Sequence, residues 1–391
     1  MFDKIQYFPA LSTRTHEQLA YAKCSPSVKD RMVPIVTLTR YDMEETLEET
    51  ASILLNDLGG RSAIVDFDAL PRAITSVEEA AEQRRRKQAV RAASGEKPSR
   101  PRSEKELAND AERRRKAQAF NGDINKLTHP MHGPIRWVEM ISEFPELLPI
   151  FGHGTPDLIR NQLNIISRKG TNGALRIDPR HPYASSAIPG SIGAIRDHAE
   201  ALVIIVDLKS MRGEYTDAKA AATSFLTEFY RDLGGEAESL TVVLLSNSFP
   251  VAKTSLKDLS RTLTIDELRL HEEVSRTFSS VRYGDYMSVA PRRSSSKGGN
   301  GWFPHVDLVA PDAWHIVLYE SNSDKAKYIK AATDTVSGPN WRNRADCWGT
   351  SVIARVDADK TLEIDGKKFT SPTGWISVRA NQHLTQMVLS R

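Results

Sequence analysis

The feature that most constrains the fold is a short, unbroken apolar run, Ala201–Val206, that ends in Asp207 and Lys209. A run so short and so rich in β-branched residues, with a helical pattern on each side, indicates a strand that is buried on both faces. Charged residues can end such a strand only where it reaches the surface. In a parallel sheet this is the carboxyl edge, where ligand sites form. The sequence therefore predicts a parallel sheet with a polar rim.

The same strand pattern, followed by a helix pattern, recurs about eight times in the first part of the chain. This order is typical of a TIM-barrel-like (β/α)8 domain of the α/β class. A doubly wound sheet is the alternative, but no Gly-rich GxGxxG turn follows the first strand, so we favour the barrel. The predicted strands are Gln6–Leu11, Met32–Thr39, Ser62–Asp68, Glu146–Gly152, Gly173–Asp178, Ala201–Ser210, Leu240–Leu245 and Ser280–Tyr286. The helices predicted between them include Tyr41–Leu58, Ser191–Ala199 and Leu256–Thr277.

A basic, charged insertion at residues 78–118 interrupts this order. Between Glu82 and Lys116 thirteen basic residues stand against six acidic ones, so this segment carries +7 while the rest of the chain carries −4. Its composition is typical of two charged helical pieces joined by a Pro/Ser-rich hinge, or of disorder. The insertion is either a solvated extension or an arm that binds nucleic acid, a nucleotide or another polyanion. The anion-binding candidates in it are Arg84, Arg85, Arg86, Arg113, Arg114 and Arg115.

The pattern changes at about residue 291, which divides the chain into a barrel at residues 1–290 and a small C-terminal α+β appendage at residues 291–391. In the appendage we expect strands at Ala313–Tyr319 and Gly349–Val356. Thr361–Thr370 is a predicted hairpin whose turn is Asp365-Gly366. Arg292–Asn300 is a predicted loop, and an apolar-rich segment, Gly374–Leu389, is expected to complete the appendage.

Composition narrows the class of protein. No window approaches about 18 consecutive apolar residues, so no membrane span is predicted, and the amino terminus lacks a signal-peptide pattern. The chain has two cysteines, Cys24 and Cys347, which allow at most one disulfide and exclude a zinc site made of cysteines. This scarcity favours a reducing, cytoplasmic location.

Eight short motifs, taken in order, resemble those of the beta protein family. They are YFPAL, VPIVTL, VDFD, LRID, VIIVDL, SNSFP, YGDY and NQHLTQMV, and they cover nearly the whole chain outside the insertion. The resemblance implies a barrel fold and a setting among prophage and phage-defence genes, but no particular reaction. The positions it marks are Asp66, Arg176, Asp207, Ser248, Pro250, Glu267, Asp285 and His383. The chain departs from the family at Ile265, where an arginine is expected, and at Trp375-Ile376, where Trp-Arg is expected.

Charged residues at the predicted strand ends form the candidate site. Closing the barrel would bring them to one mouth, where so many carboxylates need cations, protons or a metal ion as partners. The candidates for catalysis are Asp66, Arg176, Asp207, Lys209, Asp285 and His383, with Asp68 and Asp178 beside them. Asp66 and Asp207 could hold Mg²⁺ or Mn²⁺, because these ions prefer oxygen ligands. Thr155, at a predicted helix start, could bind an anion through the helix N-terminus.

Two functions are compatible with these residues. The first is a phage-defence or mobile-element protein that recognises a partner protein, such as another defence-system component, or an anionic or nucleic ligand through the mouth and the basic arm. The second is a metal-assisted hydrolase or phosphodiesterase with its site at the barrel rim, in which His383 or Asp285 acts as acid or base. A purely structural set of salt bridges that closes the polar end of the core is the alternative to both. The first function is favoured, because no HExxH, P-loop or GxSxG motif is present.

Overall fold

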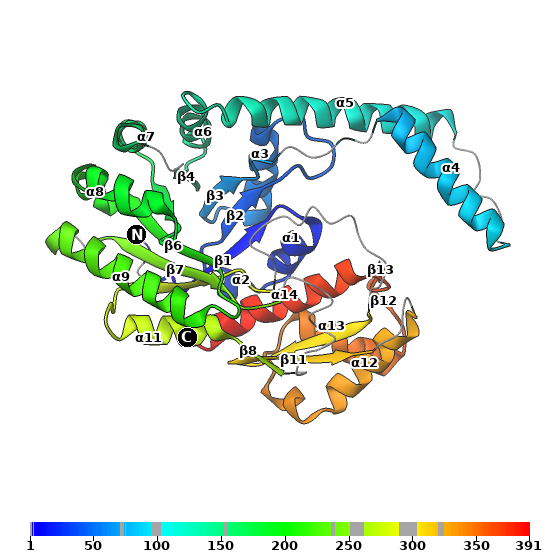
Figure 1. Cartoon of the computed structure of the whole chain (residues 1–391). Helices are drawn as coiled ribbons and strands as arrows, with labels where there is room; N and C mark the ends of the chain where they lie inside the picture. Colours follow the sequence, from blue (N-terminus) through cyan, green and yellow to red (C-terminus); the bar gives the residue numbers. More distant parts are fainter. Residues whose placement is uncertain are drawn as a thin grey trace.

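The computed structural model describes residues 2, 4–70, 74, 76–95, 103–151, 155–235, 239–250, 262–288, 303–319 and 324–391. The main body is a closed barrel of parallel strands in the order β1-β2-β3-β4-β5-β6-β7-β9 (Figure 1). These strands are β1 Tyr7–Ser12, β2 Ile35–Leu38, β3 Ala63–Phe67, β4 Leu147–Phe151, β5 Gly173–Ile177, β6 Leu202–Ser210, β7 Thr241–Asn247 and β9 Val281–Asp285. All eight predicted barrel strands are present, and the TIM-barrel-like fold is confirmed.

Two apolar cores lie on the two sides of the barrel wall. Successive residues of a strand point to opposite faces, so every second residue points into the barrel. The inward-facing residues form one cluster that includes Phe8, Ile64 and Leu245. The outward-facing residues, Tyr7 and Tyr283 among them, pack under the surrounding helices in a larger cluster. The position of a residue in this alternation therefore decides whether its side chain lies inside the barrel or under the surrounding helices.

The helices that cover the barrel begin and end at residues with clear capping roles. The Thr155 hydroxyl accepts a hydrogen bond from the Leu158 N–H, Pro156 follows at the first helical position, and Gly170 ends this helix in the left-handed conformation with φ 63°. This confirms the predicted helix start at Thr155. The covering helices are α1 Thr15–Ala22, α2 Pro26–Lys29, α3 Leu47–Leu58, α6 Gly133–Ile141, α7 Pro156–Lys169, α8 Pro182–Asp197, α9 Tyr215–Leu233 and α11 Asp266–Ser275.

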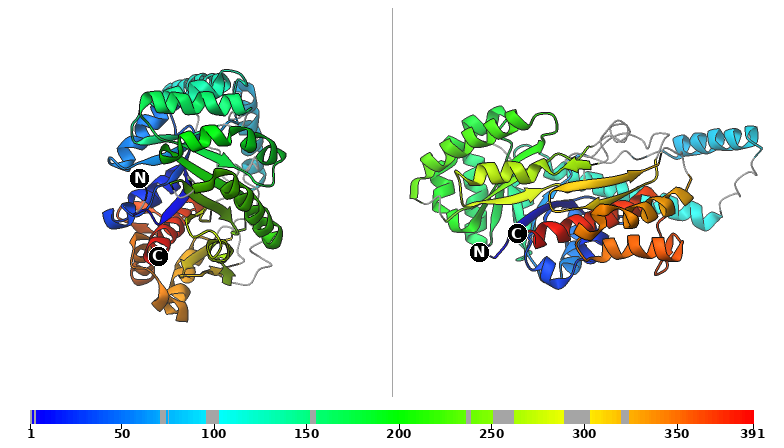
Figure 2. Two further views of the ribbon diagram at one scale, coloured as in Figure 1. Left: turned by 90° about the vertical axis from the view of Figure 1, so that its left-hand side faces the viewer. Right: turned by 90° about the horizontal axis from the view of Figure 1, so that it is seen from below.

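The basic insertion forms two helices, α4 Val77–Ala93 and α5 Glu104–Leu127. The carboxyl end of α5 is fixed to the barrel, because Phe120, Ile124 and Leu127 are buried in the outer core. Helix α4 extends away from the barrel (Figures 1 and 2). The predicted hinge lies mostly at residues 96–102, which are outside the described residues.

The appendage has a three-stranded sheet in the order β10-β11-β8, with strands His305–Val309, Ala313–Leu318 and Thr262–Thr264. It also contains α12 Ala326–Ser337, the 3-10 helix Pro339–Asn343, α13 Trp348–Asp359 and α14 Pro372–Leu389. Helix α14 packs against α13 of the appendage and α1 of the barrel, so it lies between the two parts (Figure 1). Strand β8 comes from before residue 290 and pairs with β11, so the sheet combines segments from both sides of the expected boundary.

Three predicted elements differ from the structure. Gly349–Val356 is part of a helix rather than a strand, because its buried residues recur at the helical spacing of 349, 352, 353 and 356. Helix α3 begins at Leu47 rather than Tyr41, since Thr46 caps it. Of the helix predicted at Leu256–Thr277, residues 256–261 lie outside the described residues, 262–264 form β8, and only α11 is helical.

The remaining predictions, for the appendage and for one barrel helix, have mixed outcomes. The hairpin is confirmed, with Glu363–Ile364 as β12, Lys367–Lys368 as β13 and left-handed φ values at both Asp365 and Gly366. The loop predicted at 292–300 lies outside the described residues. Helix α8 begins nine residues before the predicted start at Ser191. None of the described helices combines the length and the apolar character needed to cross a membrane.

Candidate functional site

Three charged side chains point into the barrel at its carboxyl end. Asp66 in β3, Arg176 in β5 and Asp207 in β6 each come two residues after an inward-facing apolar residue of the same strand. They are in contact although they are up to 141 positions apart in sequence. The structure thus brings these three predicted residues together at one mouth.

Arg176 lies at the centre of this group. Its Nε donates to Asp207 Oδ2 at 2.9 Å, and its Nη2 lies 2.8 Å from the same oxygen. Its Nη1 donates to Asp66 Oδ2 over a longer distance, 3.2 Å. Burial by itself would lower the pKa of Arg176, but the neighbouring Asp207, Tyr286 and Asp66 outweigh it and raise that pKa. The guanidinium therefore stays charged and is shared by two carboxylates.

Tyr286 completes the group, and sequence reasoning missed it. Its hydroxyl donates to Asp207 at 2.8 and 2.9 Å from the two carboxylate oxygens and accepts a hydrogen bond from Arg176 Nη2. Tyr286 follows Asp285 directly in the YGDY motif. Since neighbours in a strand face opposite sides, only one of these two residues can enter the mouth, and this signal was present in the sequence.

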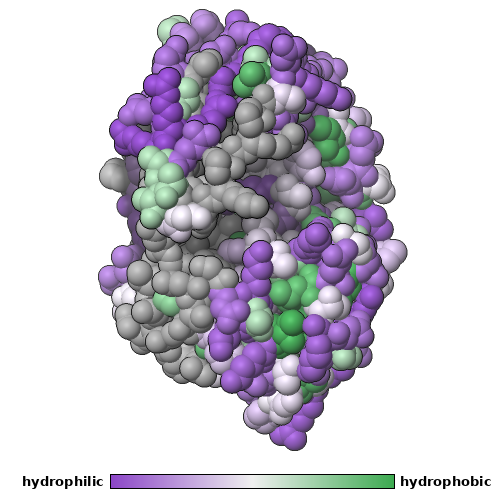
Figure 3. Space-filling model, turned by 90° about the vertical axis from the view of Figure 1, so that its right-hand side faces the viewer, coloured by the Kyte–Doolittle hydropathy of each residue, from purple (hydrophilic) through white to green (hydrophobic). Residues whose placement is uncertain are grey.

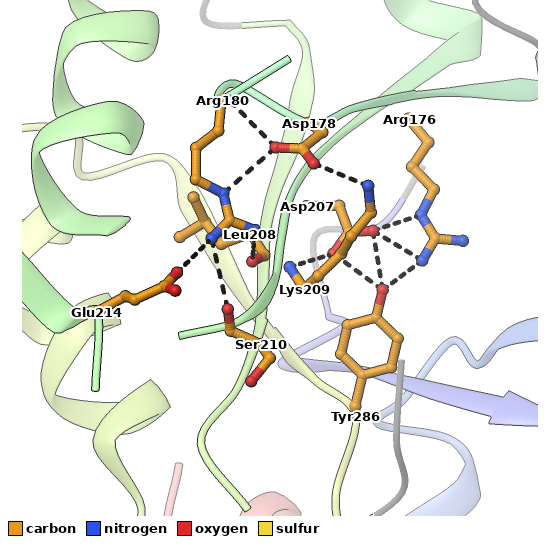
Figure 4. A network of polar contacts seen from close by, with 9 residues as sticks. All are labelled: Arg176, Asp178, Arg180, Asp207, Leu208, Lys209, Ser210, Glu214 and Tyr286. Atoms are coloured by element: carbon orange, nitrogen blue, oxygen red, sulfur yellow. Dashed lines mark hydrogen bonds and ion pairs between the residues drawn. The ribbon is translucent and has the colours of Figure 1, made fainter. Parts of the chain in front are cut away.

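A second set of ion pairs lies beside the first (Figure 4). Lys209 Nζ donates to Asp178 Oδ2 at 2.7 Å. Arg180 Nε contacts Asp178 at 3.5 Å, and its Nη1 contacts Glu214 at 3.3 Å. The β6–β7 pairing is irregular between Asp207 and Ser210, and Lys209 there has a left-handed φ of 52°. This bulge directs the Lys209 side chain toward Asp178. The backbone N–H of Lys209 donates to Asp207 Oδ1 at 2.9 Å.

The pKa values of Asp66 and Asp178, the two outer carboxylates of the mouth, are shifted in opposite directions. Burial raises the pKa of Asp66, although Arg176 and the Phe67 N–H oppose this effect. Burial would also raise the pKa of Asp178, but the hydrogen bonds from Lys209 and the Arg180 N–H outweigh it and lower that pKa. Asp66 is therefore the easier of the two to neutralise.

The mouth does not suit the predicted metal ion. The Asp207 carboxylate already accepts hydrogen bonds from Arg176, Tyr286 and the Lys209 N–H. Asp66 accepts from Arg176 and from the Phe67 N–H. Within the part of the chain that the structure describes, no three His, Cys, Asp or Glu side chains gather where they could hold a metal ion. The carboxylate oxygens that would bind Mg²⁺ or Mn²⁺ thus already accept hydrogen bonds from Arg176, Tyr286 and backbone N–H groups.

Asp285 and His383 do not belong to the mouth, which corrects the expectation that all the strand-end charges converge there. Asp285 shares its face of β9 with Val281 and Tyr283, which pack in the outer core. His383 Nε2 donates to Asp285 Oδ2 at 2.7 Å, and both side chains are buried. The hydroxyls of Tyr7 and Tyr283 each donate to Asp285 at 2.6 Å. Asp285 is therefore the centre of a separate network under α14.

Glu267 and Ser248, two further positions marked by the family resemblance, lie near this second network. Glu267 is in the first turn of α11 and accepts hydrogen bonds from both the N–H and the hydroxyl of Ser248. Burial and the negative charge of Asp285 raise the pKa of Glu267 to about 8, despite the bonds from Ser248. The carboxyl group of Glu267 therefore holds its proton to a higher pH than an ordinary glutamate does.

Four of the predicted anion-binding residues, Thr155, Arg86, Arg113 and Arg115, have partners within the chain. Thr155 caps α7. Arg113 pairs with Asp42, and Arg115 pairs with Glu45, so both hold α5 against the loop before α3. Arg85 and Arg86 lie on the projecting α4, where Arg86 pairs with Glu82.

The side chains at the mouth differ in how far they are exposed to solvent. Figure 3 shows the side of the molecule toward which the barrel strands run, and this face is hollowed near its middle. Lys209 and Arg180 keep 32% and 28% of their side-chain surface exposed, and Arg176 keeps 17%, whereas Asp207 keeps only 2%. The cations of the mouth are thus more accessible than the carboxylate that anchors Arg176.

Comparison with known proteins agrees with the resemblance noted in the sequence. A family model described as Beta protein matches residues 7–389. Protein beta of Enterobacteria phage P4 is 20% identical to this chain over 393 residues, and the match covers 99% of this chain and 94% of the phage protein. The match extends through both the barrel and the appendage.

Proposed function

The chain belongs to the Beta protein family, and we propose that it is a phage-associated binding protein whose barrel mouth recognises a phosphate-bearing ligand. The observation that carries this proposal is the set of three cations at the carboxyl ends of the adjacent strands β5 and β6. Arg176 of β5, Lys209 of β6 and Arg180 in the loop after β5 keep 17%, 32% and 28% of their side-chain surface exposed. All three are drawn in the polar network of Figure 4. Guanidinium and ammonium groups are the side chains that bind phosphate oxygens most strongly.

Asp66 is the partner that an incoming anion would replace. It has the longest bond to Arg176, 3.2 Å, and 30% of its side chain is exposed. Its raised pKa means that it loses its charge more readily than an ordinary aspartate. When Asp66 is neutral or displaced, Arg176 Nη1 becomes available to a phosphate oxygen, while Asp207 and Tyr286 still hold the rest of the guanidinium.

The arm supplies a second basic surface for a nucleic acid. Helix α5 is fixed to the barrel by Arg113 and Arg115, so these two residues act in holding the arm. The basic run at Arg84–Lys87 lies on α4, which extends away from the barrel. Contacts of such a helix with a phosphate backbone would weaken steeply as the salt concentration rises.

The test compares mouth variants in binding to two probes, inorganic pyrophosphate and a fluorescein-labelled single-stranded DNA of about 20 nucleotides, a length that exceeds the span of one binding site. Lys209→Met should weaken pyrophosphate binding by at least about tenfold, since a charge-assisted hydrogen bond contributes about 1.5–3 kcal/mol. Asp66→Asn should strengthen it, because the competing charge is removed. Lys169→Met is the matched control: Lys169 also pairs with a carboxylate, Glu143 at 2.6 Å, but it lies at the carboxyl end of α7, just before β5.

Three results would contradict the proposal. The first is that neither pyrophosphate nor the DNA binds. The second is an equal loss of affinity in the Lys169→Met control, and the third is weaker pyrophosphate binding in Asp66→Asn. The last result would instead favour a role of the Asp66 carboxylate in holding the ligand. Binding of DNA but not of pyrophosphate would assign the affinity to the arm rather than to the mouth.

A further inference from the structure

We propose that α14 positions the mouth from the opposite side of the barrel wall. Its Arg379 and His383 hold the segment Asp285–Ser288, and Tyr286 within this segment keeps Arg176 and Asp207 in place. Both residues are thus positioning residues, not groups that touch a ligand. The ligand-binding part of the test below rests on the proposed function, whereas the geometric part does not.

The first anchor is the pair His383 and Asp285. His383 Nε2 donates to Asp285 Oδ2 at 2.7 Å, and its ring stacks on Trp314 with centroids 4.7 Å apart and planes 1° from parallel. The hydroxyls of Tyr7 and Tyr283 supply two further donors to the same carboxylate. Groups on α14, β11, β1 and β9 thus fix the end of β9 in one orientation.

The second anchor is one helical turn earlier on α14. Arg379 Nε donates to Ser288 Oγ at 2.5 Å, and its Nη2 donates to the Ser288 carbonyl at 3.4 Å. Asp307 of β10 orients the guanidinium through Nη1 at 2.6 Å, and the ring of Phe249 lies 4.7 Å from its central carbon. Because residues four apart share one face of a helix, Arg379 and His383 hold both ends of Asp285–Ser288.

The backbone between the anchors is bent. Met287 has a left-handed φ of 53°, which is uncommon for a residue with a long side chain. Its N–H donates to Asp285 Oδ1 at 2.8 Å, so the carboxylate that receives His383 also stabilises this bend. The bend sets the direction in which the chain leaves β9, immediately after Tyr286.

Tyr286 connects the anchored segment with the charged residues inside the barrel. It directly follows Asp285, the last residue of β9, and points to the opposite face, where its hydroxyl contacts both Asp207 and Arg176. The other hydrogen bonds of Arg176 described here are to carboxylates of β3 and β6, Asp66 and Asp207. Tyr286 is therefore the link through which a displacement of α14 reaches the guanidinium.

The experiment measures the ionisation of Tyr286 by ultraviolet absorbance titration. Burial and Asp207 raise the pKa of Tyr286 well above 10, so it should not titrate with ordinary tyrosines in the wild type. In His383→Leu, which removes the donor to Asp285, one more tyrosine should titrate near pH 10. This signal should disappear when Tyr286→Phe is added, which separates Tyr286 from Tyr7 and Tyr283.

Three further variants keep the test decisive. His383→Gln retains an N–H donor and should restore the wild-type titration. Ser288→Ala removes the hydroxyl that accepts from Arg379 Nε and leaves the bond to the Ser288 carbonyl, so it should show the same direction of change even if His383→Leu fails to fold. Leu384→Ala is the control, because Leu384 is fully buried next to His383 but its side chain cannot form any of the hydrogen bonds described above. It should lower the melting temperature and leave the titration unchanged.

The results distinguish the positioning role of α14 from phosphate binding at the mouth. Unchanged titration in both His383→Leu and Ser288→Ala would overturn the positioning role, and so would an equal change in Leu384→Ala. Pyrophosphate affinity should fall several-fold in His383→Leu and recover in His383→Gln. If the wild type does not bind pyrophosphate, the proposed ligand is wrong, and the titration alone decides whether α14 positions the mouth.

Discussion

Replacing Glu267 with glutamine should remove a pH dependence from the stability of the folded protein. Glu267 is 3% exposed, and its carboxyl group accepts two hydrogen bonds from Ser248. Burial and the nearby charge of Asp285 raise its pKa from 4.5 to about 8. Between these two pH values the folded chain keeps a proton on Glu267 that the unfolded chain has released.

The sign and size of the effect come from this difference. Stability falls with rising pH wherever the folded state binds more protons than the unfolded state. The contribution of Glu267 is therefore fully present below pH 4.5 and is lost as the pH rises through about 8. Each pH unit in this range corresponds to about 1.4 kcal/mol, so the whole interval corresponds to about 5 kcal/mol.

The assay is urea unfolding followed by circular dichroism at several pH values between 5.5 and 8.5. The difference between wild type and Glu267→Gln isolates this group from the other titratable groups of the chain. Glu273→Gln is the control on the same helix: hydrogen bonds from Lys219 and Arg269 lower the pKa of Glu273 to about 2, so its charge does not change in this window. The same slope in Glu267→Gln as in the wild type would refute the reasoning.

Two further substitutions test the packing and the arm. Gly173→Ala should destabilise the chain by about 1–3 kcal/mol in thermal unfolding, because a Cβ there would lie 2.5 Å from an Ile166 methyl carbon and 2.6 Å from the Phe151 ring. Gly193→Ala is the control: nothing lies within 4 Å of its Cβ, so the change should be neutral or slightly stabilising. Arg115→Ala should cost less than about 1 kcal/mol, since its ion pairs are exposed, but it should speed cleavage of the arm by subtilisin; a loss of several kcal/mol would contradict the assignment of Arg115 to a surface clamp.

Much of the barrel could be predicted from the sequence, because its signals are local. Short apolar runs that end in charges mark strands, and capping residues such as Thr155-Pro156 mark the starts of the helices between them. The period of two residues in a strand also placed Asp66, Arg176 and Asp207 correctly, since each continues an inward-facing row. The mouth as a meeting point of distant charges was therefore within reach of sequence reasoning.

The elements that could not be predicted depend on distant partners. Gly349–Val356 is rich in β-branched residues, yet it is helical because α13 packs against α14, where a Cβ on Gly349 would lie 2.4 Å from the Val378 carbonyl oxygen. Strand β8 forms because β11 pairs with it. Local propensity is too weak to decide such cases against tertiary packing.

The sequence by itself determined the order of strands and helices and the charges at the strand ends. Only the tertiary structure decided on which side of the barrel wall each charge lies. Asp285 faces outward to His383, which is 98 residues away, while its neighbour Tyr286 enters the mouth. The alternation of side chains along β9 is set by backbone geometry, but the face that is inside is set by closure of the barrel and by the packing of α14 over its outer surface.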